Sequence, residues 1–588
     1  MILHLLKTRF RQALRQALGP FVDDPAPYVE MIRPSQDPKF GDYQANMAMP
    51  LGKTLGKPPR EIAAEIVARL DLTGLCAPAE IAGPGFINLR VADSLLGALL
   101  QKAVGDEERL AIAGIDPAGK KRYVIDYSAP NVAKPMHVGH IRSTMIGNAL
   151  VRILRFYGHD VITDNHIGDW GTQFGMILYG YRHFLDKADY ETNPVQELSR
   201  LYRLVRQLAD QPNEEGERIT ALVLEETAKL HKGDPENLAL WHKFVPVCME
   251  EIERIYERLG VEFDHTLGES FYQPMLAPLV DDLIQRGIAT ETEGAIGVFL
   301  DGYETPMLIR KRDGAFLYST TDLATIQYRL KEFQPDAILY LTDFRQSLHF
   351  EQLFKAAAFM VNEQPLPELV HVKFGTVLGE DGKPFKTRSG DTVGLESLLD
   401  EAETRAFAVL EKNLDGEQDK LDKLETARRI GLGALVYADL SQNRESDYVF
   451  SFDKMLAMNG NTATYMQYAY ARVRSIFTKG NIDVAALRRL PEEPSSFCLT
   501  TPQERALALE LLKFDEAMES AIRDYRPNVL TAYLYELANR YSHFFEHCPV
   551  LKADDESVKQ SRLKLCDLTA RTIRLGLRLL GIETVERM

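Results

Sequence analysis

Cysteine is scarce in this sequence, and long apolar runs are missing from it. The five cysteines are odd in number, lie far apart and include no Cys-x-x-Cys pair: Cys76, Cys248, Cys498, Cys548 and Cys566. This pattern excludes a disulfide scaffold and a cysteine zinc knuckle, and it predicts reduced thiols in a cytoplasmic protein. No run of about 18 consecutive apolar residues occurs, so no membrane span is predicted.

Positive charge is also in short supply. Lysine and arginine total 69 against 85 aspartates and glutamates, which gives a formal net charge of −16. A chain with this balance is not a general polyanion binder, so any nucleic acid must be held by a local surface. The charge is uneven, because residues 466–588 contain 18 basic and 17 acidic residues and are therefore close to neutral.

Length and composition indicate a multidomain globular protein. At about 150 residues per domain, the 588 residues predict three or four domains. The shares of hydrophobic residues, 45%, and charged residues, 26%, are those of ordinary globular chains. Residues 1–19 interleave apolar and basic residues at helical spacing, which we interpret as a first surface helix, with a transit peptide as the alternative.

The order of the predicted elements divides the chain into four regions. Residues 1–112 combine helices with short strands and predict a small α+β domain. In residues 113–395 strands alternate with helices, which predicts an α/β domain on a Rossmann-like, doubly wound parallel sheet. A charged helical stretch at about 185–295 interrupts that domain as an insertion. We expect a helical connector at 396–465 and an all-α helical bundle domain at 466–588.

The most informative candidate site is SAPNVAKPMHVGH, residues 128–140, which lies between a predicted strand and a long helix. Doubly wound folds bind phosphate at such a turn, because backbone N–H groups and the helix dipole converge on it. His137 and His140 can hydrogen-bond a triphosphate, and Gly139 lets a nucleotide approach the backbone. Two alternatives are a His-x-x-His metal pair, which lacks a third ligand at suitable spacing, and histidines that only pack in the core.

Five ordered motifs resemble those of one family. HVGH is similar to the HIGH signature of class I aminoacyl-tRNA synthetases, and residues 128–144 resemble its version in bacterial-type arginyl-tRNA synthetases. Four more motifs follow in order: GDWGTQFG (168–175), TDFRQSLHFEQ (342–352), GNTATYMQYAYARVRS (460–475) and GIETVERM (581–588). The resemblance therefore runs from FGDYQANMAM near the N-terminus to Met588, and it implies a monomer.

The resemblance implies an ATP-dependent ligase, with Mg²⁺ accompanying ATP. The carboxylate of L-arginine would attack the α-phosphate and release pyrophosphate, and the arginyl group would then pass to the terminal ribose of tRNA(Arg). The first step builds negative charge on phosphate oxygens, so it needs positioned donors rather than a protein nucleophile. The implied ATP-binding residues are His137, Gly139, His140, His349, Val377 and Leu378.

Synthetases of this class also carry a mobile KMSKS loop, which corresponds here to FKTRS, residues 385–389. Phe385 stands in place of the first lysine and Arg388 in place of the second. The cation that contacts the phosphates is therefore open between Arg388, Lys386 and Lys134. Our hypothesis is that Lys134, just upstream of HVGH, supplies part of this charge.

By the same resemblance, five residues bind the amino acid. Tyr318 and Asp322, four residues apart on a predicted helix, would hold the guanidinium, with Asp126 as a second acidic group. Asn131 and Gln346 would hold the α-amino end. Such a site rejects lysine and uncharged analogues because they leave buried carboxylates unpaired, so no editing domain is expected.

The tRNA partner directs attention to the flanking domains. Arg571, Arg574 and Arg578 repeat at spacings of three and four and predict a basic stripe, for which a merely solvated helix face is the alternative. By resemblance the N-terminal domain would also contact the tRNA.

Two other functions compete with this one. A synthetase-like RNA-binding protein without catalysis is disfavoured because both histidines of HVGH are present. A class I synthetase of different specificity is disfavoured because Tyr318, Asp322 and Asp126 suit a cationic side chain.

Overall fold

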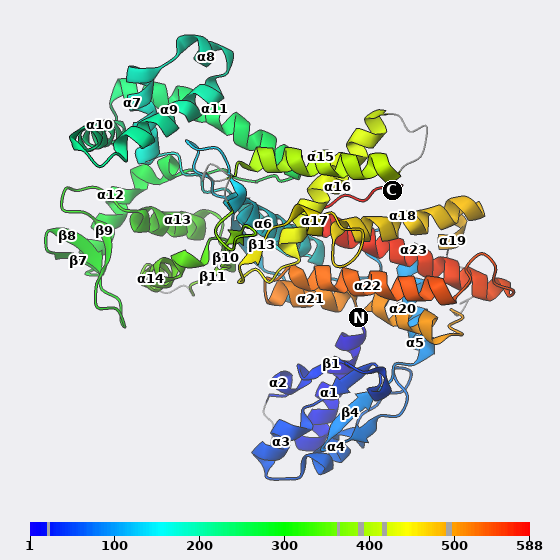
Figure 1. Ribbon diagram of the computed structural model, residues 1–588. Helices are drawn as coiled ribbons and strands as arrows, with labels where there is room; N and C mark the ends of the chain where they lie inside the picture. The colour runs from blue at the N-terminus through cyan, green and yellow to red at the C-terminus, as the bar shows by residue number, and fades with distance from the viewer. Residues whose placement is uncertain (20–23, 362–364, 386–392, 414–419, 490–496) are drawn as a thin grey trace.

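The computed structural model describes residues 1–19, 24–361, 365–385, 393–413, 420–489 and 497–588. The chain forms a small N-terminal domain, an α/β core with a helical insertion and a helical C-terminal part (Figure 1). This arrangement confirms the predicted fold class. Among the described residues, no helix combines the length and apolarity needed to cross a membrane.

The N-terminal domain packs helices on a four-stranded antiparallel sheet of order β1-β2-β4-β3. Leu6, Phe10 and Leu14 of the first helix recur at helical spacing and are at most 1% exposed, so this helix buries one apolar face. The elements are α1 (Ile2–Leu18), α2 (Ala26–Val29), β1 (Ile32–Pro34), β2 (Tyr43–Ala45), α3 (Ala48–Leu55), α4 (Pro59–Val67), β3 (Glu80–Ala82), β4 (Phe86–Leu89) and α5 (Asp93–Gly105).

The core is a parallel sheet of order β11-β10-β5-β6. Its strands are β5 (Arg122–Asp126), β6 (Asp160–Asp164), β10 (Ala337–Tyr340) and β11 (Glu368–His371). Alternate residues of β5 face opposite sides: Ile125 packs in the core that contains α6 (Val138–Tyr157), and Val124 packs in the core that contains α13 (Tyr318–Glu332) and α14 (Ser347–Ala358). The sheet is therefore covered on both faces. All four strands are parallel, and the strand order reverses at β5, because the chain adds β6 on one side of β5 and later β10 on the other.

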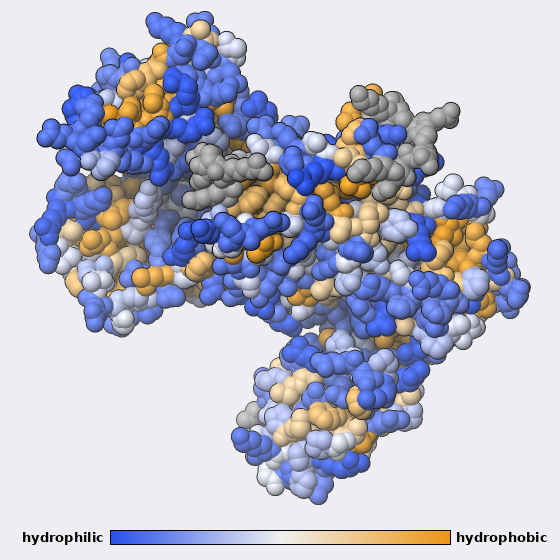
Figure 2. Space-filling model, in the orientation of Figure 1, coloured by the Kyte–Doolittle hydropathy of each residue, from blue (hydrophilic) through white to orange (hydrophobic). Residues whose placement is uncertain are grey.

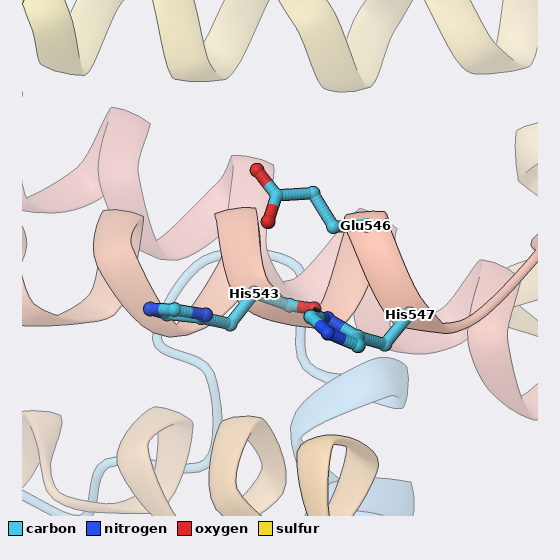
Figure 3. Close-up of side chains that lie close together, drawn as sticks. All are labelled: His543, Glu546 and His547. Carbon is cyan, nitrogen blue, oxygen red and sulfur yellow. Dashed lines mark hydrogen bonds between the residues drawn. The ribbon is translucent and has the colours of Figure 1, made fainter.

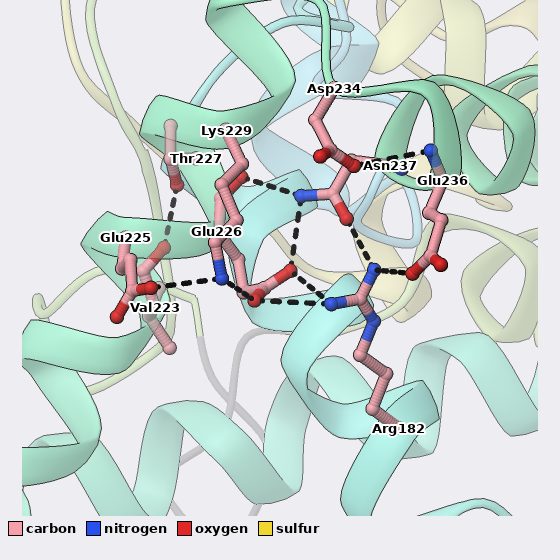
Figure 4. Close-up of polar contacts among 9 residues, drawn as sticks. All are labelled: Arg182, Val223, Glu225, Glu226, Thr227, Lys229, Asp234, Glu236 and Asn237. Carbon is pink, nitrogen blue, oxygen red and sulfur yellow. Dashed lines mark hydrogen bonds and ion pairs between the residues drawn. The ribbon is translucent and has the colours of Figure 1, made fainter.

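The insertion lies between β6 and β10 and is more varied than predicted. Its helices are α7 (Thr172–Phe184), α8 (Lys187–Thr192), α9 (Pro194–Ala209), α10 (Glu214–His231), α11 (Pro235–Leu259) and α12 (Glu269–Gln285). A buried polar network joins three of them: Arg182 of α7 pairs with Glu226 of α10 at 3.0 Å, and Asn237 of α11 donates to Glu226 at 3.0 Å (Figure 4).

An antiparallel sheet follows α12, at the end of the stretch for which a helical insertion was predicted. It consists of β7 (Ala289–Thr292), β8 (Ala295–Val298) and β9 (Met307–Arg310). Glu293 and Gly294 connect β7 to β8, both with positive φ, 49° and 83°, as a two-residue hairpin turn requires. The strands have only four residues each, too few for a clear alternating pattern in the sequence.

The C-terminal part consists mainly of helices. They are α15 (Leu395–Asn413), α16 (Lys420–Leu440), α17 (Phe452–Met455), α18 (Ala463–Gly480), α19 (Val484–Arg488), α20 (Pro502–Leu512), α21 (Phe514–Arg523), α22 (Asn528–His547) and α23 (Glu556–Leu579). One exception corrects the all-helical expectation for this part: β13 (Tyr448–Val449) pairs in parallel with β12 (Val377–Leu378). Leu530, Leu534 and Leu537 of α22 are fully buried, as their helical spacing predicts.

The N-terminal domain contacts the C-terminal bundle directly. Helix α5 packs against α20 and α23, and Figure 1 shows the blue N-terminal domain joined to the bundle along α5. Arg505 of α20 pairs with Asp42 at 2.8 Å and with Asp93 at 2.7 Å. Because Arg505 and Asp42 are largely buried, this ion pair fixes the orientation of the N-terminal domain.

Candidate active site

The residues predicted to bind ATP and arginine gather at the carboxyl edge of the parallel sheet. This edge includes the point between β5 and β10 at which the strand order reverses, and open α/β sheets bind ligands at such a point. After β5 the chain turns through Ser128 and Ala129, both in the left-handed region with φ of 71° and 47°. Ser143 Oγ accepts from the Ser128 N–H at 2.9 Å, and Asn165 Oδ1 accepts from the Ala129 N–H at 3.0 Å, so this strained turn is firmly held.

His137 and His140 stand at the start of α6 with their rings 4.0 Å apart. The Gly139 N–H donates to His137 Nδ1 at 3.1 Å, and the His137 N–H donates to His140 Nδ1 at 3.0 Å. Each Nδ1 is thus an acceptor, so each neutral ring carries its proton on Nε2. Burial lowers the pKa of both imidazoles, that of His140 to about 3, and the charge of Lys134 lowers both further. At neutral pH the pair therefore offers two neutral Nε2–H donors.

The position of the His137 ring requires glycine at residue 139. A Cβ at position 139 would lie 2.9 Å from the His137 ring. The missing side chain therefore lets the His137 imidazole fold over the first turn of α6 and cap it.

Lys134 lies within electrostatic reach of both imidazoles, and its Nζ is 5.4 Å from the ring centroid of Tyr202 in α9. Lys386 and Arg388 lie outside the described residues. The described chain resumes at residue 393, and this segment lies beside the site. The Val138 N–H donates to Val393 O at 3.0 Å, and the Leu395 N–H donates to Met136 O at 2.9 Å.

Tyr318 and Asp322 occupy the first two turns of α13, on the helix that the sequence predicted. Tyr318 is 64% exposed. His349 Nε2 lies 2.6 Å from an Asp322 carboxylate oxygen, so a residue predicted to bind ATP and one predicted to bind arginine contact each other. The hydrogen bond to Asp322 raises the pKa of His349 above its usual value, against the effect of burial. In the free chain, His349 is therefore the side chain that occupies the Asp322 carboxylate.

Glu269, the first residue of α12, is an acidic group at this site that sequence reasoning missed. Burial raises its pKa to about 7, and the charges of Asp169 and Asp322 contribute to the rise. Two carboxylates that repel each other in a half-buried position favour a bound cation. The one local signal was an acidic residue within the mixed apolar stretch TLGESFY at a helix start, and nothing in the sequence linked it to Asp322, 53 positions later.

Asp126 was predicted to help bind the arginine substrate, and the structure shows it in a buried ion pair. Its carboxylate pairs with Arg329 at 2.7 Å, and Arg329, 0% exposed, also pairs with Asp164 at 2.8 Å. The Asp126 carboxylate is thus already compensated by a buried guanidinium at the ends of β5 and β6. A direct contact with arginine stays a prediction.

The two residues predicted to hold the α-amino end lie on loops at this edge. Asn131 Oδ1 is buried and has no hydrogen-bond partner among the described residues, so a free acceptor is available. Gln346 is exposed at the start of α14. Val377 and Leu378, predicted to contact ATP, form β12, where their carbonyls accept from Phe385 at 3.1 Å and Phe450 at 2.9 Å.

Three family models cover almost the whole chain. Residues 102–452 match tRNA synthetases class I (R), catalytic domain; residues 466–588 match the DALR anticodon binding domain; and residues 4–91 match the arginyl tRNA synthetase N terminal domain. An arginine–tRNA ligase of Rhodopirellula baltica is 46% identical, with 100% of this chain and 99% of the relative covered. The chain belongs to the arginyl-tRNA synthetase family. An arginine–tRNA ligase of Escherichia coli K12 is 45% identical, with 99% of both chains covered.

Solved arginyl-tRNA synthetases have the same architecture. The enzyme of Plasmodium falciparum superposes with a TM-score of 0.83 at 28% identity, covering 100% of this chain and 99% of the other. That of Thermus thermophilus gives a TM-score of 0.82 at 26% identity, covering 100% of both chains. Family membership predicted from the five motifs is thereby confirmed.

The predicted basic stripe on α23 needs a correction. Arg571 is 4% exposed and donates to the carbonyls of Val104, at 3.0 Å, and Asp106 in the segment around the end of α5. It therefore holds two parts of the chain together and is not available on a surface. Arg574 and Arg578 are exposed, and neither guanidinium has a hydrogen bond or ion pair within the described part of the chain. Helical spacing alone could not show that α5 covers one side of α23.

An apolar hollow of about 190 Å³ lies near the C-terminus, lined by Leu410, Ile430, Met458, Tyr468 and Met588. Figure 2 shows apolar surface in the region of α15–α17. Because Met458 and Tyr468 remain 37% and 38% exposed, this hollow is open to solvent.

Proposed function

We propose that this chain joins L-arginine to tRNA(Arg) at the expense of ATP. A carboxylate oxygen of arginine bonds to the α-phosphorus as the bond to pyrophosphate breaks, and a terminal ribose hydroxyl of the tRNA then displaces AMP from the arginyl carbonyl. The observation that carries the proposal is the pairing of an acidic pocket, Asp322 and Glu269, with two neutral imidazole donors at one sheet edge.

His137 and His140 are the proposed phosphate-binding donors. As ATP reacts, negative charge grows on oxygens of the α-phosphate and of the departing pyrophosphate, and Nε2–H groups held by backbone hydrogen bonds need no reorganisation to meet it. Lys134 adds positive charge beside them. If Lys134→Ala leaves the rate of arginine activation within a few-fold of the parent rate, this role is wrong.

Arginine recognition rests on charge and on the shape of the guanidinium. Asp322 and Glu269 supply negative charge from α13 and α12, Tyr318 supplies a hydroxyl from the same face of α13, and Asn131 Oδ1 accepts from the α-ammonium group. A neutral isostere such as citrulline leaves both carboxylates unpaired, and lysine lacks the planar fork of donors.

Mg²⁺ is proposed to arrive with the phosphates of ATP. Within the described residues, three ligand side chains that could hold a metal ion come together elsewhere, at His543, Glu546 and His547. The site thus fits a metal carried by the substrate, which neutralises phosphate charge when bound. We also propose that the protein works as a monomer in the cytoplasm, which suits its unpaired cysteines.

The tRNA is proposed to contact the C-terminal bundle through Arg574 and Arg578, with the hollow around Tyr468 receiving an unstacked base. Replacing both arginines with glutamate then raises the KM for tRNA and leaves the KM for arginine unchanged. An unchanged KM for tRNA would remove these arginines from the interface.

Pyrophosphate exchange with arginine, lysine and citrulline, each with and without tRNA, tests the function. Of the three amino acids, we expect only arginine to support exchange. Exchange with another amino acid would favour a synthetase of different specificity, and no exchange under any condition, together with tRNA binding, would favour a non-catalytic RNA-binding protein.

A further inference from the structure

One turn of α22 presents two imidazoles and a carboxylate to solvent, far along the chain from the active-site motifs. His543, Glu546 and His547 are all exposed, and one ligand atom from each lies within 4.8 Å of the others. Figure 3 shows the two imidazoles side by side along the helix and the Glu546 carboxylate above them. The spacing i, i+3, i+4 places all three on one side of the helix.

These side chains are free to serve as ligands. Neither His543 nor Glu546 has a side-chain hydrogen bond or ion pair in the part of the chain that the structure describes. His547 Nδ1 lies 2.8 Å from the main-chain carbonyl of His543, so this nitrogen must be the donor and Nε2 keeps its lone pair. A hydrogen bond from the distal ring nitrogen to a carbonyl is the arrangement that orients histidine ligands in metal sites.

We propose that His543, Glu546 and His547 form a surface site for a divalent transition-metal ion of the zinc type. Two imidazoles and one carboxylate form a borderline ligand set, which suits Zn²⁺ and disfavours Mg²⁺ and Ca²⁺. Ligand atoms around tetrahedral Zn²⁺ lie about 3.4 Å apart, given metal–ligand bonds of about 2.0–2.2 Å. The three ligand atoms already lie within 4.8 Å of one another, and their side chains are exposed, so they can rotate towards a bound ion. Water completes the coordination shell.

The place of the site in the helix suggests what the ion does. His547 is the last residue of α22, and the Cys548 N–H donates to the carbonyl of Phe544 at this end of the helix. An ion bound to residues 543, 546 and 547 adds side-chain links across the last turn, where the final carbonyls of a helix lack N–H donors from a following turn. The ion therefore stabilises the C-terminal end of α22 and takes no part in arginine activation.

The histidines of HVGH are a different case. Both of their Nδ1 atoms accept from backbone N–H groups, and no carboxylate joins them in a three-ligand cluster among the described residues. Zinc binding seen in a titration can therefore be assigned to α22 by substituting the histidines of that helix.

Calorimetric titration of the full chain with Zn²⁺, without ATP, tests the proposal. The parent is expected to bind one ion at a site that is lost, or weakened at least tenfold, when His543→Gln and His547→Gln are combined. Glu546→Gln is expected to give an intermediate affinity. The matched control is His242→Gln, an exposed helical histidine outside the cluster, which should titrate like the parent.

A second readout separates binding at this turn from binding elsewhere. Zn²⁺ should slow amide hydrogen exchange over residues 544–548 in the parent and in His242→Gln but not in the double variant. Arginylation measured without Zn²⁺ should be equal in all four proteins, which shows that each is folded. If the double variant binds Zn²⁺ within twofold of the parent, or if the exchange of this turn does not respond to Zn²⁺, the proposal is wrong.

Discussion

At the scale of single residues, the carboxylates proposed to bind arginine already have partners in the free chain. Asp322 is paired with His349 at 2.6 Å, and Asp126 with Arg329 at 2.7 Å. The two pairs differ in burial, since Arg329 is 0% exposed while the side chains of His349 and Asp322 are about a third exposed, at 32% and 27%. The exposed pair is the one that a substrate can displace, so we propose Asp322 as the carboxylate that binds the guanidinium.

Asp322→Asn should therefore raise the KM for arginine by about two orders of magnitude, because removing one partner of a desolvated charge pair costs ~2–5 kcal/mol. The KM for ATP should change less than threefold. Steady-state pyrophosphate exchange measures both constants. Glu332→Gln, which removes an exposed carboxylate from the same helix, is the control and should leave both constants unchanged. An arginine KM within threefold of the parent value would remove Asp322 from the site.

Arginine binding should release protons near pH 7. Glu269 has a pKa of about 7, so it is partly protonated at that pH, and the hydrogen bond to Asp322 raises the pKa of His349. A guanidinium lowers the pKa of Glu269 by attraction, and it lowers that of His349 by taking its partner Asp322. Arginine affinity should therefore increase as the pH rises from 6 to 8.

Calorimetry in two buffers of different ionisation enthalpy counts these protons. Glu269→Gln should reduce the number released while arginine still binds. Proton uptake, or an affinity that does not vary with pH, would contradict this description of the site.

Sequence reasoning works best for features that lie within a short stretch of chain. HVGH lies at the start of α6, and Tyr318 and Asp322, which the family resemblance singled out, lie on α13; their roles in binding stay predictions. Glu269 and Arg571 depend on what folds against them: Glu269 matters because Asp322 lies nearby, and Arg571 is buried because the chain around the end of α5 covers it. No single-sequence pattern records such contacts.

At the scale of elements, α6 links the active site to the rest of the core. Its first turn carries both histidines, and its buried Arg142 pairs with Asp439 of α16 at 2.9 Å and donates to Gly375 O at 2.8 Å. With Arg142 1% exposed, this arginine fixes the helix against the segment after β11. The position of the two imidazoles thus depends on a contact that spans about 300 residues of sequence.

Arg142→Met should lower the free energy of unfolding by about 3–5 kcal/mol, because it leaves Asp439 buried and unpaired. Arg155→Met, on the same helix, breaks an ion pair with Asp264 that is 45% exposed on each side and should cost less than about 1 kcal/mol. Urea unfolding followed by circular dichroism compares the two. Equal losses would mean that the buried pair does not anchor α6.

The predicted elements show the same division between local and distant information. The parallel sheet was predicted from the alternation of strands and helices in residues 113–395, and the first helix from its apolar spacing. The sheet β7–β9 was missed because its strands follow one another without intervening helices, and the pair β12–β13 was missed because it joins two-residue segments that lie far apart in the sequence.

At the scale of the whole molecule, the net charge of −16 limits the ways in which the protein can bind RNA. The chain does not attract polyanions in general, so a bound tRNA must be held by local groups and by shape, and Arg574 and Arg578 are the groups that we propose. The buried contact of Arg505 with Asp42 ties the N-terminal domain to the C-terminal bundle. A tRNA that touches both ends of the molecule therefore meets a preset geometry.

We propose that this chain places arginine, and no other amino acid, on tRNA(Arg). The most direct test incubates the purified chain with ATP, Mg²⁺, total tRNA and all twenty amino acids, and then identifies the amino acid and the tRNA in the acylated product. We expect arginine as the only amino acid in that product, esterified to tRNA(Arg). Another amino acid in the product, or no acylated tRNA at all, would show that the proposed function is wrong.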